Sequence, residues 1–242
     1  MLDILLDRWS VVPVIAVMAY LLGSINWAII ITRLRSRKDI REVGSGNAGA
    51  TNVLRSQGVL PAVLTLIGDA GKGVLAALAG GWIASLLPVG EMAFGPEELT
   101  VFGRYVAAVF VVTGHVFPVF YGFRGGKGVA AIGGLLFVLD WRVGLIAVGV
   151  FALTVLLSRM VSLGSVLAGV AIIVSTFVLC CWVDRMVMET VWFCTISIGI
   201  PVSMAIAKHG GNIRRIIAGT ERRIGEKVSA DTESSAEQGE QK

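Results

Sequence analysis

Five patches of glycine, small polar and basic residues interrupt an otherwise apolar chain, and their chemistry suits the binding of phosphate. Backbone N–H groups in glycine-rich turns can face an anion, and neighbouring Lys or Arg supply the opposite charge. The patches lie at about residues 44–55, 68–73, 114–128, 159–165 and 208–221. We therefore expect a polar site that several loops assemble together.

The first patch reads GSGNAGATNVLR and offers hydroxyl, amide and guanidinium groups within a short loop. Ser45 and Thr51 carry hydroxyls, Asn47 carries an amide, and Arg55 can hold a phosphate through two parallel hydrogen bonds. The alternative is a turn that caps a helix beginning near Thr51. Because a cap needs only one such residue, we favour a binding role.

The patch GHVFPVFYGFRGGKGVA brings a lysine to the start of an apolar helix. Lys127 and the amides of Gly125 and Gly126 would lie at the positive end of that helix. The patch is not a Walker A loop, because Tyr121 stands where the first glycine is required and no Ser or Thr follows the lysine. Nucleotide hydrolysis is therefore disfavoured. His115 could serve the site or be a buried packing residue.

Three further signals come from charged residues at or within apolar segments. Asp69 and Lys72 would share one helix face, as part of the site or as an ion pair that only neutralises itself. Arg159 could be a site cation or an interfacial anchor. The last patch, KHGGNIRRIIAGTERR, contains His209 and Asn212, and its arginines would also suit a helix lying on anionic lipid.

The elements that must position these loops are membrane helices. Of the 242 residues, 55% are hydrophobic and the mean hydropathy is +0.79, which is too apolar for a soluble domain of this length. The apolar segments run at about 11–32, 59–87, 100–120, 129–139, 143–157, 162–183 and 187–207. Two of them are short, on either side of Asp140-Trp141-Arg142, and could form one span or two.

The distribution of charge decides between six and seven spans. With seven, 16 of the 21 Lys and Arg residues share one face, whereas a merged pair would put the basic C-terminal run opposite the first basic loop. We therefore predict an all-α integral membrane protein with seven transmembrane helices, the N-terminus outside, the C-terminus cytoplasmic and the site at the cytoplasmic face. We expect one membrane domain, 1–224, and a disordered polar tail, 225–242.

Other classes of function fit the sequence less well. The basic residues, which give a pI near 9.2, cluster between apolar segments rather than along a nucleic-acid-binding stripe. Cys180, Cys181 and Cys194 lie within apolar runs, which indicates packing rather than metal binding. A transporter for a phosphorylated metabolite would place polar groups at the membrane midplane and would often show an internal repeat, and this sequence shows neither pattern.

Three segments, GSGNAGATN, GHVFPVFYGFRGGKGVA and HGGNIRRIIAGTE, resemble the signature loops of the PlsY family of bacterial acyl-phosphate glycerol-3-phosphate acyltransferases. They occur in the family's order, and the resemblance covers about residues 20–222. It implies seven helices in the bacterial cytoplasmic (inner) membrane. It also implies transfer of a fatty acyl group from acyl phosphate to the sn-1 hydroxyl of glycerol 3-phosphate, giving lysophosphatidate and phosphate in the first acylation step of phospholipid synthesis.

The resemblance and the residue chemistry together define the candidate site. As catalytic residues we expect Ser45, Asn47, Lys127 and His209. As substrate-binding residues we expect Asp69, Lys72, Thr51, Arg55, His115, Gly125, Gly126, Arg159 and Asn212. The sequence departs from the family pattern at Ala131, where Thr is usual, and at Gly210, where a basic residue often follows the histidine. We expect no metal, cofactor or nucleic acid, a lipid bilayer as surroundings, and a monomer.

The donor that the resemblance implies has consequences for mechanism. Acyl phosphate is already activated, so positioning and charge stabilisation matter more than a covalent nucleophile. A His with an Asp five residues later, as other glycerolipid acyltransferases use, is absent, since Phe120 and Arg214 occupy the two positions. The general base is left open between His115, His209 and the phosphate of glycerol 3-phosphate itself.

Overall fold

The computed structural model describes residues 11–86 and 96–225, and all regular structure in these two stretches is helical. The elements are α2 (Val11–Ser24), α3 (Trp27–Ser36), η1 (Ile40–Glu42), α4 (Ala50–Gln57), α5 (Val59–Ser85), α6 (Pro96–Val116), η2 (Val119–Tyr121), α7 (Val129–Leu139), α8 (Trp141–Ser158), α9 (Val161–Val178), η3 (Leu179–Val183), α10 (Met188–Lys208) and α11 (Gly210–Ile217). The predicted C-terminal tail lies outside these residues, apart from Gly225.

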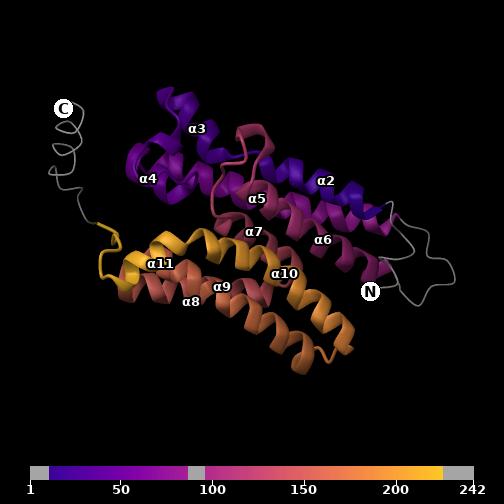
Figure 1. Cartoon of the computed structure of the whole chain (residues 1–242). Coiled ribbons are helices and arrows are strands. Elements are labelled where there is room, and N and C mark those ends of the chain that lie inside the picture. The colour runs from indigo at the N-terminus through magenta and orange to yellow at the C-terminus, as the bar shows by residue number, and fades with distance from the viewer. Residues whose placement is uncertain (1–10, 87–95, 226–242) are drawn as a thin grey trace, which may run out of the picture.

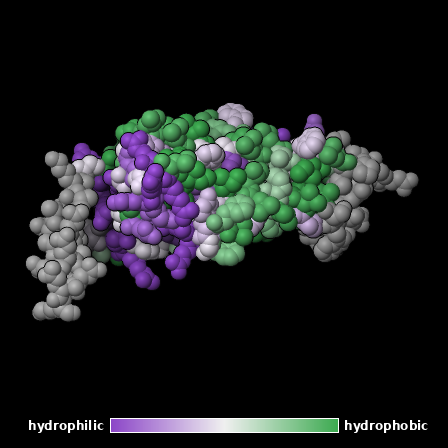
Figure 2. Space-filling model, turned by 90° about the horizontal axis from the view of Figure 1, so that it is seen from above, coloured by the Kyte–Doolittle hydropathy of each residue, from purple (hydrophilic) through white to green (hydrophobic). Residues whose placement is uncertain are grey.

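The long helices run roughly along one axis and form an elongated bundle (Figure 1). Helices α3, α4 and α11 lie at one end, and the first turns of α2, α6 and α10 lie at the other (Figure 1). Figure 2 shows hydrophilic residues gathered at the end that contains α3 and α4, and a broad hydrophobic region along the rest of the bundle. This distribution suits a bundle whose apolar sides face lipid and whose polar end faces water.

Within the described residues, six stretches are long and apolar enough to cross a membrane: Val11–Ser36, Val59–Ser85, Glu97–Tyr121, Trp141–Ser158, Val161–Val183 and Met188–Lys208. The two short apolar segments form separate helices, α7 and α8. They part at Asp140, whose carboxylate caps α8 by accepting a hydrogen bond from the Arg142 amide at 2.9 Å. Helix α7 has 11 residues, a length of roughly 16 Å against ~30 Å of hydrocarbon. The seven-span topology therefore stays a prediction.

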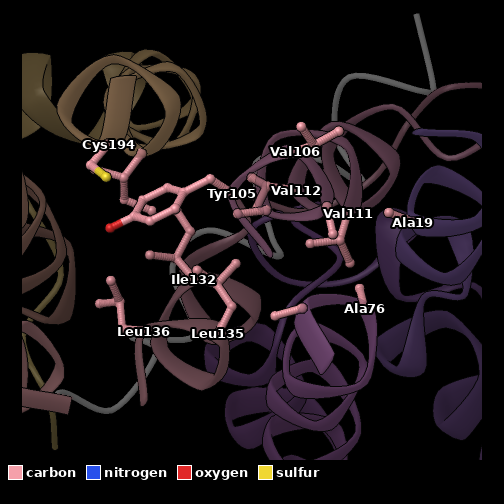
Figure 3. Packing of buried hydrophobic residues seen from close by; sticks show 14 of the residues in the cluster. Ala19, Ala76, Tyr105, Val106, Val111, Val112, Ile132, Leu135, Leu136 and Cys194 are labelled. Carbon is pink, nitrogen blue, oxygen red and sulfur yellow. The ribbon is translucent and has the colours of Figure 1, made fainter. Parts of the chain in front are cut away.

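Helix α6 lies at the centre of the hydrophobic core. Figure 3 shows its Val111 beside Ala19 of α2 and Ala76 of α5, while its Tyr105 reaches toward Cys194 of α10. Small residues allow α7 to approach α5 closely, since a Cβ at Gly134 would lie 2.1 Å from the carbonyl oxygen of Ala70. The core thus fixes α7, and with it the loop that precedes α7.

The first apolar segment is interrupted, which its hydropathy does not predict. Helix α2 ends at Ser24 and α3 begins at Trp27. The Asn26 side chain caps α3, because its Oδ1 accepts a hydrogen bond from the Ile29 amide at 3.1 Å. An asparagine within an apolar run can thus restart a helix after a short break. The break lies next to the loops of the candidate site.

Candidate active site

Four of the five predicted patches meet at the polar end of the bundle. The loop of the first patch, here the first loop, touches the loop of the patch at residues 114–128, here the second loop, at Gly126, where a Cβ would lie 2.4 Å from the carbonyl oxygen of Ala48. The second loop touches the last, because the Lys127 ammonium donates a hydrogen bond to Asn212 Oδ1 at 2.6 Å. The start of α9 joins them through Ser162, whose hydroxyl donates to Glu221 at 2.7 Å.

The Glu221 carboxylate connects the side chains of this network. Its Oε1 accepts hydrogen bonds from the Ser162 hydroxyl and, at 2.6 Å, from the Asn212 amide. Its Oε2 pairs with the Arg215 guanidinium at 2.8 Å. Burial raises the pKa of Glu221, but hydrogen bonds from Ser162, Asn212 and Arg215 outweigh burial and hold it below its ordinary value. The ionised carboxylate therefore orients the Asn212 amide so that its oxygen faces Lys127.

Lys127 lies half-buried among other charges. Burial and the nearby positive charges of Arg215 and Arg55 lower its pKa from 10.5 to about 8, and Glu221 opposes this shift. One ammonium proton bonds Asn212. Lys127 is thus a cation at the start of α7 whose charge is felt by Arg55 and Arg215.

His209 is held as a neutral imidazole. Its Nδ1 lies 2.8 Å from the Ala205 carbonyl oxygen, which can only accept, so the proton is on Nδ1 and Nε2 carries the lone pair. Burial and the charge of Lys127 lower the pKa of His209 to about 4. Nε2 can therefore accept a hydrogen bond near neutral pH.

The first loop is organised by Asn52, whose amide was expected, with that of Asn47, among the groups of the loop that could bind phosphate. Its buried amide donates to the carbonyls of Ile40, Val43 and Asn47 at 2.9–3.1 Å, and its oxygen accepts from the Ser45 amide at 3.0 Å. Gly44 adopts a φ of +63° directly beside this oxygen. The loop is therefore preorganised, with an exposed Ser45 and a half-buried Asn47 and Thr51.

Five helices begin at this end without a side-chain cap. They are α4, α5, α7, α9 and α11, which follow Gly49, Gly58, Gly128, Met160 and His209. The first amides of each helix have no intrahelical acceptor, and the helix dipole makes these ends positive. Such uncapped ends suit anionic ligands, and they argue against the alternative that the side chains of the first loop serve to cap α4.

Gly125 and Gly126 lie in the predicted place, but their amides bond within the protein. The Gly125 amide donates to the Val116 carbonyl and the Gly126 amide to the His115 carbonyl, both at 3.2 Å. A Cβ at Gly125 would lie 2.0 Å from the His115 oxygen. Both glycines allow the second loop to approach α6. They leave no side chain in the way, and their amides donate hydrogen bonds to carbonyls at the end of α6.

The remaining candidates lie apart from the Lys127 network. Asp69, Lys72 and His115 are buried and bond one another inside the bundle. Arg159 ends α8 with an exposed side chain, while its carbonyl accepts a hydrogen bond from the Ile224 amide at 2.8 Å. Arg159 thus holds the last described segment against the start of α9 through its backbone.

Sequence reasoning missed Glu221, Ser162 and Arg215 as parts of the network. One signal could have found Glu221, because it is the only acidic residue between Lys208 and Arg223 in a strongly basic run. A lone carboxylate among cations is a candidate for pairing. Ser162 carries no comparable signal, since hydroxyls are common in membrane helices.

Comparison with known proteins identifies relatives along almost the whole chain. The family model described as glycerol-3-phosphate acyltransferase matches residues 13–219. The glycerol-3-phosphate acyltransferase of Francisella tularensis subsp. novicida is 40% identical over 220 residues, which are 91% of this chain and 96% of that protein. The one of Jannaschia sp. is 40% identical over 210 residues, which are 87% of this chain and 91% of that protein.

Solved structures show the same fold. The crystal structure of PlsY, described as an integral membrane glycerol 3-phosphate acyltransferase in its glycerol 3-phosphate form, superposes with a TM-score of 0.72 at 32% identity, covering 88% of this chain and 96% of that one. The lysophosphatidic acid form of the same protein superposes with a TM-score of 0.70 at 30% identity.

Proposed function

The chain belongs to the glycerol-3-phosphate acyltransferase family, and we propose that it transfers a fatty acyl group from acyl phosphate to the sn-1 hydroxyl of glycerol 3-phosphate. The enzyme class follows from the family. The donor and the acylated position are the proposal, together with action as a monomer in the bacterial cytoplasmic membrane.

The observation that carries this proposal is the position of Lys127. Its ammonium lies at the uncapped start of α7, bonded to Asn212 and within the electrostatic reach of Arg55 and Arg215. Two phosphate-bearing substrates bring several negative charges together, so a site for both needs more than one cation. This end of the bundle supplies them beside five positive helix ends, next to the apolar sides where an acyl chain would lie.

The reaction follows from these groups. The sn-1 hydroxyl oxygen attacks the carbonyl carbon of acyl phosphate, and the resulting tetrahedral oxyanion collapses with cleavage of the bond between that carbon and the phosphate oxygen. Lys127 stabilises the charge that develops on the oxyanion or on the leaving phosphate. Arg55 and the first loop, with Ser45, Asn47 and Thr51, hold the phosphate groups. The products are 1-acylglycerol 3-phosphate and inorganic phosphate.

The proton of the attacking hydroxyl needs an acceptor, and we propose His209 Nε2. The Ala205 carbonyl fixes the tautomer, so that Nε2 is the basic atom. A pKa of about 4 makes the free imidazole a weak base, but bound phosphates bring negative charge that raises a neighbouring histidine pKa. The competing acceptor is the phosphate of glycerol 3-phosphate. If His209→Ala keeps near wild-type turnover, that phosphate takes the proton.

An assay of the purified protein tests the donor. Palmitoyl phosphate and glycerol 3-phosphate should yield lysophosphatidate and inorganic phosphate in equal amounts. Palmitoyl-CoA at the same concentration should give no product, because the proposed site recognises the phosphate leaving group directly. Comparable turnover with palmitoyl-CoA would contradict the donor assignment and leave the family assignment intact. Proton NMR of the product would identify the acylated hydroxyl, because acylation moves the C1 methylene resonances downfield in the sn-1 ester and the C2 methine resonance downfield in an sn-2 ester.

A further inference from the structure

Asp69, Lys72 and His115 form a buried polar cluster that the proposed reaction does not use. All three side chains are at most 4% exposed. Lys72 Nζ lies 2.9 Å from Asp69 Oδ1 and 2.8 Å from His115 Nδ1. An ammonium group only donates, so His115 Nδ1 is the acceptor and its neutral ring carries the proton on Nε2. Such a cluster is costly in a membrane unless its groups are satisfied.

Lys72 also donates hydrogen bonds to backbone carbonyls at the break between α2 and α3. Its ammonium donates to the Gly23 carbonyl at 2.9 Å and to the Ile25 carbonyl at 2.6 Å. These carbonyls lie where the helical hydrogen bonds of the first span are interrupted. Backbone carbonyls at membrane depth need a partner inside the protein, and Lys72 is that partner. Its three protons are taken by the Gly23 and Ile25 carbonyls and by His115 Nδ1, while Asp69 contributes an ion pair, so none remains for a substrate phosphate.

Two routes lead from Lys72 to the loops of the active site. In the first, Lys72 bonds the carbonyls at the break and so fixes the position of Asn26. The Asn26 amide donates to the Ala48 carbonyl at 3.5 Å. In the second, His115 packs on the second loop, where a Cβ at Gly126 would lie 2.3 Å from His115 Nε2. Both routes converge, because the same Cβ would lie 2.4 Å from the Ala48 oxygen. Ala48 follows Asn47, and Gly126 precedes Lys127.

We propose that Lys72 is a positioning residue for the acyl transfer: held by Asp69, it fixes the broken first span and His115, and so sets the distance between the loops that carry Asn47 and Lys127. This inference rests on the proposed function of that site. From the sequence, Asp69, Lys72 and His115 were expected to contact the substrate. We infer instead that they act on the active-site loops through hydrogen bonds and packing inside the protein. Since displacement of a catalytic group by about 1 Å can cost ~100-fold in rate, a purely internal cluster can control turnover.

The test separates lost charge balance from lost positioning. Lys72→Met keeps the length of the side chain, removes the donors and leaves Asp69 as an unpaired buried charge, so both stability and turnover should fall. The double variant Asp69→Asn/Lys72→Met has no unpaired charge, so its melting temperature should recover toward wild type. Its turnover should stay roughly 10- to 100-fold low, because the Gly23 and Ile25 carbonyls still have no donor. Recovery of both properties would overturn the proposal.

Two further variants keep the test decisive. Arg104→Met is the matched control, since it removes a partly buried cation of α6 whose NH1 donates to the Val138 carbonyl at 3.3 Å, away from the active-site loops. It should lower stability and leave turnover unchanged.

His115→Asn offers Oδ1 in place of Nδ1 to Lys72 but removes the ring edge at Gly126, so it should fold and lose turnover about tenfold or more. Wild-type turnover in this variant would refute the route through His115. An inactive wild-type protein would instead refute the proposed function.

Discussion

At the scale of single residues, Lys127 and His209 are adjusted to opposite roles by one environment. Both are shielded from water, which disfavours their charged forms and lowers both pKa values. Glu221 keeps Lys127 from losing its charge, whereas the Lys127 charge keeps His209 neutral. The site thus contains a cation and a neutral imidazole with a free lone pair. Two groups whose pKa values are displaced in this way are suited to charge stabilisation and proton acceptance.

Replacing Lys127 tests the cation directly. Lys127→Ala should lower kcat by at least ~100-fold, on the scale of removing one preorganised electrostatic donor. Arg124→Ala is the control, because Arg124 is an exposed cation of the same loop and should keep close to wild-type turnover. Turnover is measured as phosphate release, with melting temperatures to confirm folding. A folded Lys127→Ala enzyme with wild-type kcat would show that the site is wrongly placed.

The pH dependence of the reaction should report the same lysine. If protonated Lys127 is required, kcat/KM should be level below pH 8 and fall as pH rises past its pKa of about 8. The Glu221 carboxylate raises that pKa, so Glu221→Gln should move the alkaline limb to lower pH. The substrate's own titration is common to both profiles and cancels in the comparison. A limb that stays in place or moves upward in Glu221→Gln would contradict the assignment of Lys127.

At the scale of elements, the sequence predicted the participants better than their contacts. The division of α7 from α8 at Asp140 was readable from the charge pattern, whereas Asn212 was expected as a substrate-binding residue from the family resemblance and its contact with Lys127 was not foreseen. The break between α2 and α3 was not, because hydropathy averages Asn26 into its apolar neighbours. Glu221 was missed because its partners come from α9 and α11, and only tertiary packing brings them together. The internal use of the Gly125 and Gly126 amides likewise depends on how closely α6 lies.

The junction of the first and second loops is testable at Gly126. Gly126→Ala places a Cβ within 2.4 Å of both the Ala48 oxygen and His115 Nε2, so one loop must move. Turnover should fall ~10- to 100-fold, because Asn47 and Lys127 separate. Gly133→Ala on α7 is the matched control, since nothing lies within 4 Å of its added Cβ. Equal effects of the two substitutions on kcat would show that loop spacing does not control the reaction.

At the scale of the whole molecule, the two ends of the bundle differ in their chemistry. One end carries the cationic site around Lys127. At the other, Arg142 pairs with Asp140 and with Asp184, each at 2.7 Å, and ties the start of α8 to the connection after α9. Short as it is, α7 carries the chain from the Lys127 end toward the Arg142 end. The structure therefore makes the two ends chemically distinct, and orientation in the membrane decides which compartment supplies glycerol 3-phosphate.

The basic residues predict that the site end is cytoplasmic. Single cysteines introduced at exposed positions of a cysteine-free variant can report this, because an impermeant maleimide labels only the outer face of intact cells. Arg35→Cys and Arg222→Cys, at the site end, should stay unlabelled until the membrane is permeabilised. Glu97→Cys and Glu189→Cys, at the first turns of α6 and α10, should be labelled at once. The permeabilised sample is the control for reactivity of each thiol. Labelling of position 35 or 222 in intact cells would invert the orientation and place the acyl transfer at the outer face of the membrane.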